Sequence, residues 1–275
     1  RSKPVHFADG LLEKTSAKGS PICVGIDPVI ERIEIDGDTP PAAIERWVAT
    51  LLEQIEPYAA VVKYQSACFE RYGSAGVGCL EACITRAKLA GLAVILDAKR
   101  GDIGISAAHY AAGNLSGADA LTINPYMGPD TMQPFIDHAA AHGQGLFALV
   151  RTSNPGSDAL QTLDLADGRR VVDAVADMVV GAGADQVGER GYSLLGVVVG
   201  ATKADEIAAL RQRMPQQLFL VPGYGAQGGS ADDVRACFKP DGTGAIITAS
   251  RSIIYANDPA DAAKRMRDEI AAIVG

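Results

Sequence analysis

The sequence lacks long apolar runs and has fewer basic than acidic residues. No apolar run reaches about 18 residues, and the first residues lack the apolar core of a signal peptide, so we expect no membrane association. The chain has 25 Lys and Arg against 33 Asp and Glu, a net charge of −8. This balance argues against a nucleic-acid partner bound by a broad basic surface. Any phosphate that binds must therefore be held by a few local groups.

Cysteine and histidine are also scarce, and neither shows the spacing of a metal site. The five cysteines are an odd number without C-x-x-C spacing, which predicts reduced thiols in a cytoplasmic protein. Cys79 with Cys83, and His138 with His142, share a helix face by their spacing, and either pair could hold half of a metal site. Because companion ligands at recognisable spacing are missing, we interpret both pairs as packing residues and expect no metal.

Apolar runs alternate with Ala-rich helical stretches along the whole chain, which predicts a single domain over residues 1–275. Eight of these runs are typical of buried parallel strands, at 21–26, 59–65, 92–103, 118–123, 145–150, 194–199, 217–221 and 244–249. Helical patterns separate them, which predicts a (β/α)8 TIM barrel, and a doubly wound open sheet is the competing architecture. The barrel is favoured because it gathers all the strand ends on one face, where such folds carry their active sites.

The run 92–103 is the expected chemical centre, because it begins as an apolar strand and ends in four charged residues. Asp97 and Lys99 are two apart on a strand, so their side chains are expected on one face, with Ala98 on the other. Opposite charges about 4 Å apart gain about 4 kcal/mol at an effective dielectric near 20, against about 1 kcal/mol in bulk water. Asp102 adds a second carboxylate. The alternative interpretation is a structural salt bridge at a strand end.

Three other strands are also followed or ended by polar residues, namely Asp27, Lys63 and Ser153. Taken singly, Asp27 fits a turn former, Lys63 a surface lysine and Ser153 a polar turn. In a barrel the three residues encircle the Asp97–Lys99 pair, and this favours one shared site.

The segment 222–229 matches G-x-G-x-x-G, the motif of dinucleotide-binding loops. Such folds place an acidic residue at the end of the next strand, whereas here Ser250 and Arg251 follow it, so no nucleotide cofactor is expected. TIM barrels often bind phosphate between the loops after the last two strands. We therefore expect a phosphate site here, with Arg251 binding the oxygens bidentately. The alternatives are a tight turn for the loop and a surface cation for Arg251.

Six motifs, in order along nearly the whole chain, resemble the orotidine 5′-phosphate decarboxylase family in the variety that reads DAKRGDI. They are Val-Gly-Ile-Asp27-Pro, Val-Lys63, Asp97-Ala-Lys99-Arg-Gly-Asp102-Ile103, Arg-Thr-Ser153-Asn-Pro, Pro-Gly-Tyr-Gly-Ala-Gln227-Gly-Gly and Ser-Arg251-Ser-Ile. The resemblance implies decarboxylation of orotidine monophosphate to uridine monophosphate, the last step of pyrimidine synthesis, without a cofactor. It also implies a homodimer with shared active sites.

The resemblance further implies a role for each matching residue. A charge array would contain Lys63, Asp97, Lys99 and Asp102 of the partner subunit. Asp27 and Lys63 would bind ribose hydroxyls, Ser153 the pyrimidine amide edge, and Gln227 and Arg251 the phosphate.

Two residues depart from the family pattern. Ser106 stands at a substrate-binding position where Thr is common, and it keeps the hydroxyl. Ser250 precedes Arg251 where Gly is commoner, so its side chain could crowd the phosphate.

Two other functions remain open at this point. Magnesium-dependent sugar-phosphate decarboxylases of the same superfamily share the Asp-x-Lys-x-x-Asp strand. They resemble this chain less at the end of the second strand, where they place a metal-binding Glu and this chain has Lys63, which would repel a cation. A catalytically silent phosphate-binding protein is the third candidate, and the presence of both Lys99 and Asp102 argues against it.

Overall fold

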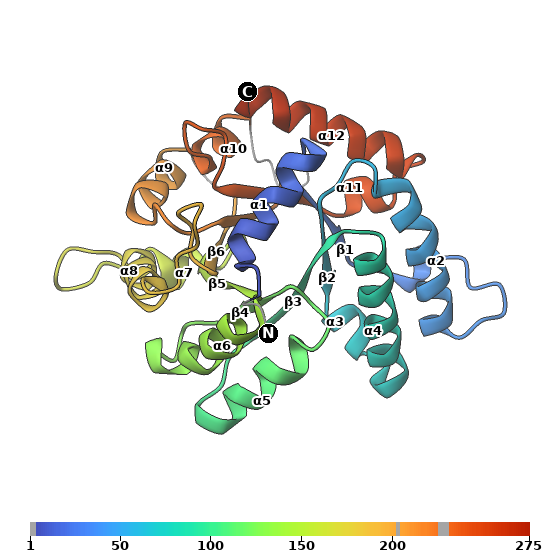
Figure 1. Ribbon diagram of the computed structural model, residues 1–275, viewed down its shortest axis with the longest axis horizontal. Coiled ribbons are helices and arrows are strands. Elements are labelled where there is room, and N and C mark those ends of the chain that lie inside the picture. Colours follow the sequence, from blue (N-terminus) through green and yellow to red (C-terminus); the bar gives the residue numbers. More distant parts are fainter. Residues whose placement is uncertain (1–3, 202–203, 225–230) are drawn as a thin grey trace.

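The computed structural model describes residues 4–201, 204–224 and 231–275. Its strands form one closed parallel barrel in chain order, in which β1 pairs with both β2 and β8 (Figure 1). The strands are β1 (Ile22–Ile26), β2 (Val61–Gln65), β3 (Ala93–Arg100), β4 (Ala120–Ile123), β5 (Gly145–Arg151), β6 (Leu195–Val199), β7 (Phe219–Pro222) and β8 (Ala245–Ala249). The predicted TIM barrel is confirmed, and the closure between β1 and β8 excludes an open sheet.

Helices follow the strands and surround the barrel (Figure 1). They are α1 (Phe7–Lys18), the 3-10 helix η1 (Ile30–Arg32), α2 (Pro40–Ile55), α3 (Ala67–Glu70), α4 (Gly73–Leu89), α5 (Gly104–Asn114), α6 (Pro129–His142), α7 (Asp158–Gln161), α8 (Val171–Gly183), α9 (Ala204–Arg213), α10 (Ala231–Cys237), α11 (Arg251–Ile254) and α12 (Pro259–Val274). Among the described residues, no helix is both long and apolar enough to cross a membrane.

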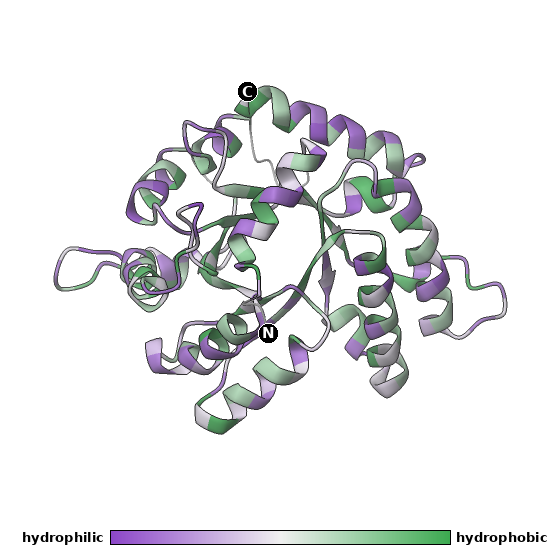
Figure 2. Ribbon diagram, viewed as in Figure 1, coloured by the Kyte–Doolittle hydropathy of each residue, from purple (hydrophilic) through white to green (hydrophobic). Residues whose placement is uncertain are grey.

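The apolar patterns explain these elements. Every residue of β1 and β8 is buried, as expected for a parallel sheet covered on both faces. Helix α2 begins with Pro40, whose missing N–H costs nothing in the first turn, and it buries Ile44, Val48 and Leu52 at intervals of four. Figure 2 accordingly shows largely green strands surrounded by a ring of helices that carry the purple residues.

Helix α1 covers the end of the barrel at which the strands begin (Figure 1). Phe7 packs edge-to-face on Phe147 of β5, with 6.0 Å between the ring centroids. The imidazole of His6 donates from Nε2 to the carbonyl of Gln186, at 3.0 Å. The strand ends opposite to α1 are therefore the end of the barrel that α1 leaves uncovered.

The structure differs from the sequence expectations mainly in short elements. The single-turn helices α3, α7 and α11 have no counterpart among the elements expected from the sequence. Each of the three has four residues, too few to show a helical repeat of apolar positions.

Candidate active site

One buried carboxylate connects three neighbouring strands near their carboxyl ends. Asp97 on β3 is 7% exposed, and its Oδ2 accepts a hydrogen bond from Lys63 Nζ on β2 at 2.9 Å. Its Oδ1 accepts from Lys99 Nζ at 2.7 Å and from Thr122 Oγ1 on β4 at 2.8 Å. The expected Asp97–Lys99 pair is present, and Lys63 binds the other oxygen of the same carboxylate.

Charge governs the protonation of this cluster. Burial lowers the pKa of Lys63, but the charges of Asp97 and Asp27 outweigh it and raise that pKa above its ordinary value. Burial likewise tends to raise the pKa of Asp97, but Lys63 and Lys99 hold it at about 2. At neutral pH the carboxylate and the Lys63 ammonium are therefore both charged.

Lys99 contacts Asp97 from a part of β3 where the backbone is not that of a regular strand. Its φ is 49°, in the left-handed region, and the β3–β4 register shifts between Leu96 and Arg100. Asp97 and Lys99 therefore meet as expected, but the backbone at Lys99 is left-handed rather than that of a regular strand. Thr122 Oγ1 accepts a hydrogen bond from Lys99 N at 2.9 Å, so one hydroxyl fixes both the backbone turn and the carboxylate.

Asp27 follows β1 and lies close enough to Lys63 to raise its pKa. Ser250, which follows β8, donates from Oγ to Asp27 Oδ2 at 2.9 Å. The hydroxyl of Ser250, the residue that stands where Gly is commoner in the family, thus donates to a carboxylate. The other oxygen, Asp27 Oδ1, is buried and has no hydrogen-bond partner among the described residues.

The other expected ligand-binding residues lie on loops after β5, β7 and β8. Arg251 begins α11, is exposed, and forms no ion pair with any residue that the structure describes. Ser153 follows β5 and is partly buried. It packs closely on Gly200, because a Cβ added to Gly200 would come within 2.8 Å of the Cβ of Ser153. Gln227 lies outside the described residues.

Asp102 and Ser106 do not join the cluster of their own chain. Asp102 Oδ1 accepts from Ile103 N at 2.8 Å, and within the described ranges it has no ion pair with Lys99. Ser106 is exposed in the first turn of α5. Both residues lie on the segment that leaves the barrel after β3.

Two residues, one in the cluster and one near Ser153, were missed in the sequence. Thr122 resembles any β-branched residue of a buried strand, so no signal marks it. Arg151, the last residue of β5, is 6% exposed and binds Asp158, Glu206 and Ser157, with Nη2 to Asp158 Oδ1 at 2.6 Å. The sequence signal that could have identified Arg151 was its position two residues before Ser153.

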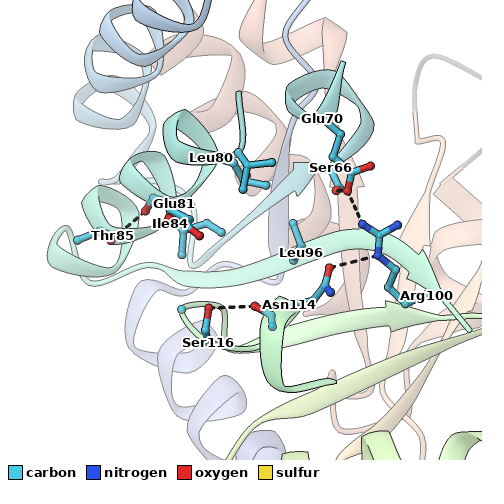
Figure 3. A pocket seen from close by; sticks show the side chains of 13 residues that line it. Ser66, Glu70, Leu80, Glu81, Ile84, Thr85, Leu96, Arg100, Asn114 and Ser116 are labelled. Atoms are coloured by element: carbon cyan, nitrogen blue, oxygen red, sulfur yellow. Dashed lines mark hydrogen bonds and ion pairs between the residues drawn. The ribbon is translucent and has the colours of Figure 1, made fainter. Parts of the chain in front are cut away.

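A cavity of about 530 Å³ lies behind β3, between α4 and α5. Figure 3 shows Arg100, the residue after Lys99, at its edge, bound to Glu70 of α3 and through Nε to Asn114 of α5. Leu96 and Leu80 form part of its apolar wall. Because Arg100 already pairs with Glu70 and Asn114, we assign no ligand to this cavity.

The two candidate half-sites for a metal lie on α4 and α6. Cys79 Sγ donates to the carbonyl of Pro41 at 3.2 Å, and Cys83 is buried beside it on α4. The rings of His138 and His142 stack with 4.3 Å between centroids. Over the described ranges, no three His, Cys, Asp or Glu side chains form a group that could hold a metal ion.

Comparisons with known proteins agree with this geometry. Residues 20–266 match the model of the orotidine 5′-phosphate decarboxylase / HUMPS family. Orotidine 5′-phosphate decarboxylase from Deinococcus radiodurans is 40% identical over 278 residues, covering 98% of each chain, and that from Rhodopirellula baltica is 39% identical over 269 residues, covering 91% of this chain and 89% of the other. The solved structure of Leishmania donovani OMP decarboxylase superposes with a TM-score of 0.83 at 37% identity, covering 98% of each chain. The chain therefore belongs to the orotidine 5′-phosphate decarboxylase family.

Proposed function

We propose that this protein decarboxylates orotidine 5′-phosphate to uridine 5′-phosphate without a cofactor. One observation carries the proposal, namely that Lys63 and Lys99 both bind the buried carboxylate of Asp97. Loss of carbon dioxide from carbon 6 leaves an electron pair in the plane of the pyrimidine ring, where no carbonyl can delocalise it. A fixed array of charges stabilises such a carbanion electrostatically.

Lys99 is the proposed proton donor. Its ammonium is held by Asp97 and is partly exposed at the open end of the barrel, so it can meet the charge that develops at carbon 6 and then protonate it. This interaction is stronger in the transition state than in the ground state, which is the condition for acceleration. The carboxylate of Asp97 lies beside the proposed position of the departing carboxylate.

The remaining groups are proposed to bind the parts of the substrate that do not react. Asp27 and Lys63 bind ribose hydroxyls, Ser153 reads the pyrimidine amide edge, and Arg251 binds the phosphate. Gln227 is proposed as a second phosphate ligand on sequence grounds alone. Enzymes typically lower the reaction barrier by about 8–23 kcal/mol, far more than one ion pair supplies, so phosphate binding far from carbon 6 must contribute.

We further propose a homodimer in which Asp102 of each chain completes the partner's site, with Ser106 of the same segment contacting the ligand. The surface around Asp102 supports this proposal, because Ile103, Ile105 and Tyr126 are 61%, 76% and 79% exposed. Large apolar side chains gathered beside a charged residue are typical of a protein interface. The free thiols of the five cysteines fit a reducing, cytoplasmic location.

Mixed dimers test the shared site. Lys99→Ala and Asp102→Ala chains are each expected to be nearly inactive alone. In a mixed dimer one site carries both changes and the other carries neither, so random mixing of equal amounts restores about a quarter of all sites by two-fold symmetry. Refolding the two variants together and measuring activity checks this number. No recovery from dimers shown to be mixed would place Asp102 in the site of its own chain.

The reaction itself is tested by the loss of orotidine monophosphate absorbance with and without a chelator. We expect the rate to be unchanged by chelation. The competing function is a magnesium-dependent sugar-phosphate decarboxylase. The Lys63 ammonium, 2.9 Å from Asp97 Oδ2, opposes it because it occupies the place of a cation. Activity that disappears on chelation and returns with magnesium would favour that alternative.

A further inference from the structure

The ends of β1 and β8 are joined by a hydrogen bond that does not belong to the barrel sheet. The pairing of Val24 with Ala249 places Gly25 beside Ser250. A Cβ on Gly25 would come within 3.0 Å of Ser250 Cβ, so glycine at this position leaves the serine side chain its room. From there Ser250 Oγ reaches Asp27 Oδ2 at 2.9 Å.

The backbone of the same segment is tied separately. Tyr255, which follows α11, donates its hydroxyl to the carbonyl of Asp27 at 3.4 Å and accepts from Val29 N at 2.7 Å. The carboxylate and the main chain of Asp27 are thus both attached to the segment that begins at Ser250. Of the two carboxylate oxygens of Asp27, Oδ1 lacks a partner among the described residues, and it is buried.

One oxygen of the Asp27 carboxylate accepts a hydrogen bond from Ser250, and the other has no partner among the described residues. This arrangement suits the carboxylate to accept a hydrogen bond from one further hydroxyl. Ionised Asp accepts hydrogen bonds only, so the missing partner of Oδ1 must be a donor. A buried acceptor left unpaired costs about 1–3 kcal/mol, and a ligand hydroxyl removes that cost when it binds. Without the Ser250 hydroxyl, the carboxylate could rotate and lose this preset direction.

We propose that Ser250 is a positioning residue that directs Asp27 Oδ1 at a ribose hydroxyl of the bound nucleotide. The inference rests on the proposed function and goes beyond it, because Ser250 acts through Asp27 and touches no reacting atom. Ser250 also directly precedes Arg251, the proposed phosphate ligand. One short segment therefore fixes the groups that bind two parts of the nucleotide.

The test compares two ligands, uridine monophosphate and its 2′,3′-dideoxy analogue, which keeps the phosphate but lacks both ribose hydroxyls. Ser250→Ala should weaken binding of uridine monophosphate about tenfold, the effect of one hydrogen bond to a charged group. Binding of the dideoxy analogue should change less than about twofold, because it has no hydroxyl for Asp27 to receive. In an Asp27→Ala background, Ser250→Ala should have no further effect on either ligand.

Titration calorimetry provides the dissociation constants, and Ser252→Ala is the matched control. Ser252 lies in α11, two residues after Ser250, is exposed, and forms no hydrogen bond with a described residue, so its replacement should leave both affinities unchanged. Equal weakening of both ligands by Ser250→Ala would mean that the serine supports the phosphate site or the fold, and this would overturn the proposal. Unchanged affinity for both would also overturn it. Failure of the unmodified protein to bind uridine monophosphate would instead refute the proposed function itself.

Discussion

Replacing Asp97 by Asn is expected to change how stability depends on pH. Burial raises the pKa of the Asp97 carboxyl, but Lys63 and Lys99 hold it at about 2, below its ordinary 3.8. A carboxyl with a lowered pKa in the folded state stabilises the fold above its unfolded pKa, and this contribution is lost as the pH falls through the folded pKa. One pKa unit corresponds to about 1.4 kcal/mol, so Asp97 contributes about 2 kcal/mol at pH 7, and about half of that remains at pH 3.

The measurement is the free energy of unfolding in urea at several pH values between 7 and 3. At pH 7 the Asn variant should be less stable by about 3 kcal/mol, because the buried ammonium of Lys63 loses its nearest carboxylate. When the pH is lowered from 7 to 3, the difference in the free energy of unfolding between the two proteins should decrease by about 1 kcal/mol. Asp268→Asn is the control, because it removes one negative charge from an exposed side chain and so tests for an effect of net charge alone.

Two results would refute this reasoning. Parallel stability curves for the unmodified protein and Asp97→Asn would show that the two lysines do not lower the pKa of Asp97. A narrowing of the same size in Asp268→Asn would assign the effect to net charge rather than to the buried cluster.

Three other substitutions test separate parts of the site. Lys99→Ala should reduce turnover below detection while uridine monophosphate still binds, and substantial remaining turnover would exclude Lys99 as proton donor. Arg251→Ala should raise KM strongly and lower kcat/KM, since a phosphate contact acts through binding and positioning, and an unchanged KM would remove Arg251 from the site. Thr122→Val should lower the free energy of unfolding by about 1–3 kcal/mol and also reduce kcat/KM, because Asp97 and the backbone of Lys99 both lose a partner. A variant with full kcat/KM would show that Thr122 does not position Lys99.

The fold was predictable because its signals are local. Each buried strand appears in the sequence as a short apolar run, and the Ala-rich helical stretches lie between these runs. Four-residue helices such as α11 carry no such repeat, so their boundaries come from contacts rather than from the sequence pattern. The closing of β8 on β1 followed only from the number of units and their order.

The site was predictable in its charged residues and unpredictable in its supporting ones. Asp97 and Lys99 stand out as charges at the end of an apolar run. The left-handed conformation of Lys99 could not be predicted, because a lysine in a sequence gives no sign that its φ is 49°. The partners of Arg151 include Glu206, 55 residues away, and a contact at that separation is invisible to spacing arguments.

The barrel register gives the two lysines of the cluster different proposed roles. Lys63 pairs with Ile95, two residues before Asp97, so its ammonium must reach about 6–7 Å along the strand direction to the carboxylate. Its side chain is consequently 8% exposed, whereas that of Lys99 is 45% exposed on the same carboxylate. A buried ammonium keeps the charge of Asp97 fixed but has little freedom to move, while an accessible one can approach a substrate atom. The register therefore supports Lys99 as the group that transfers the proton and Lys63 as the group that holds the array in place.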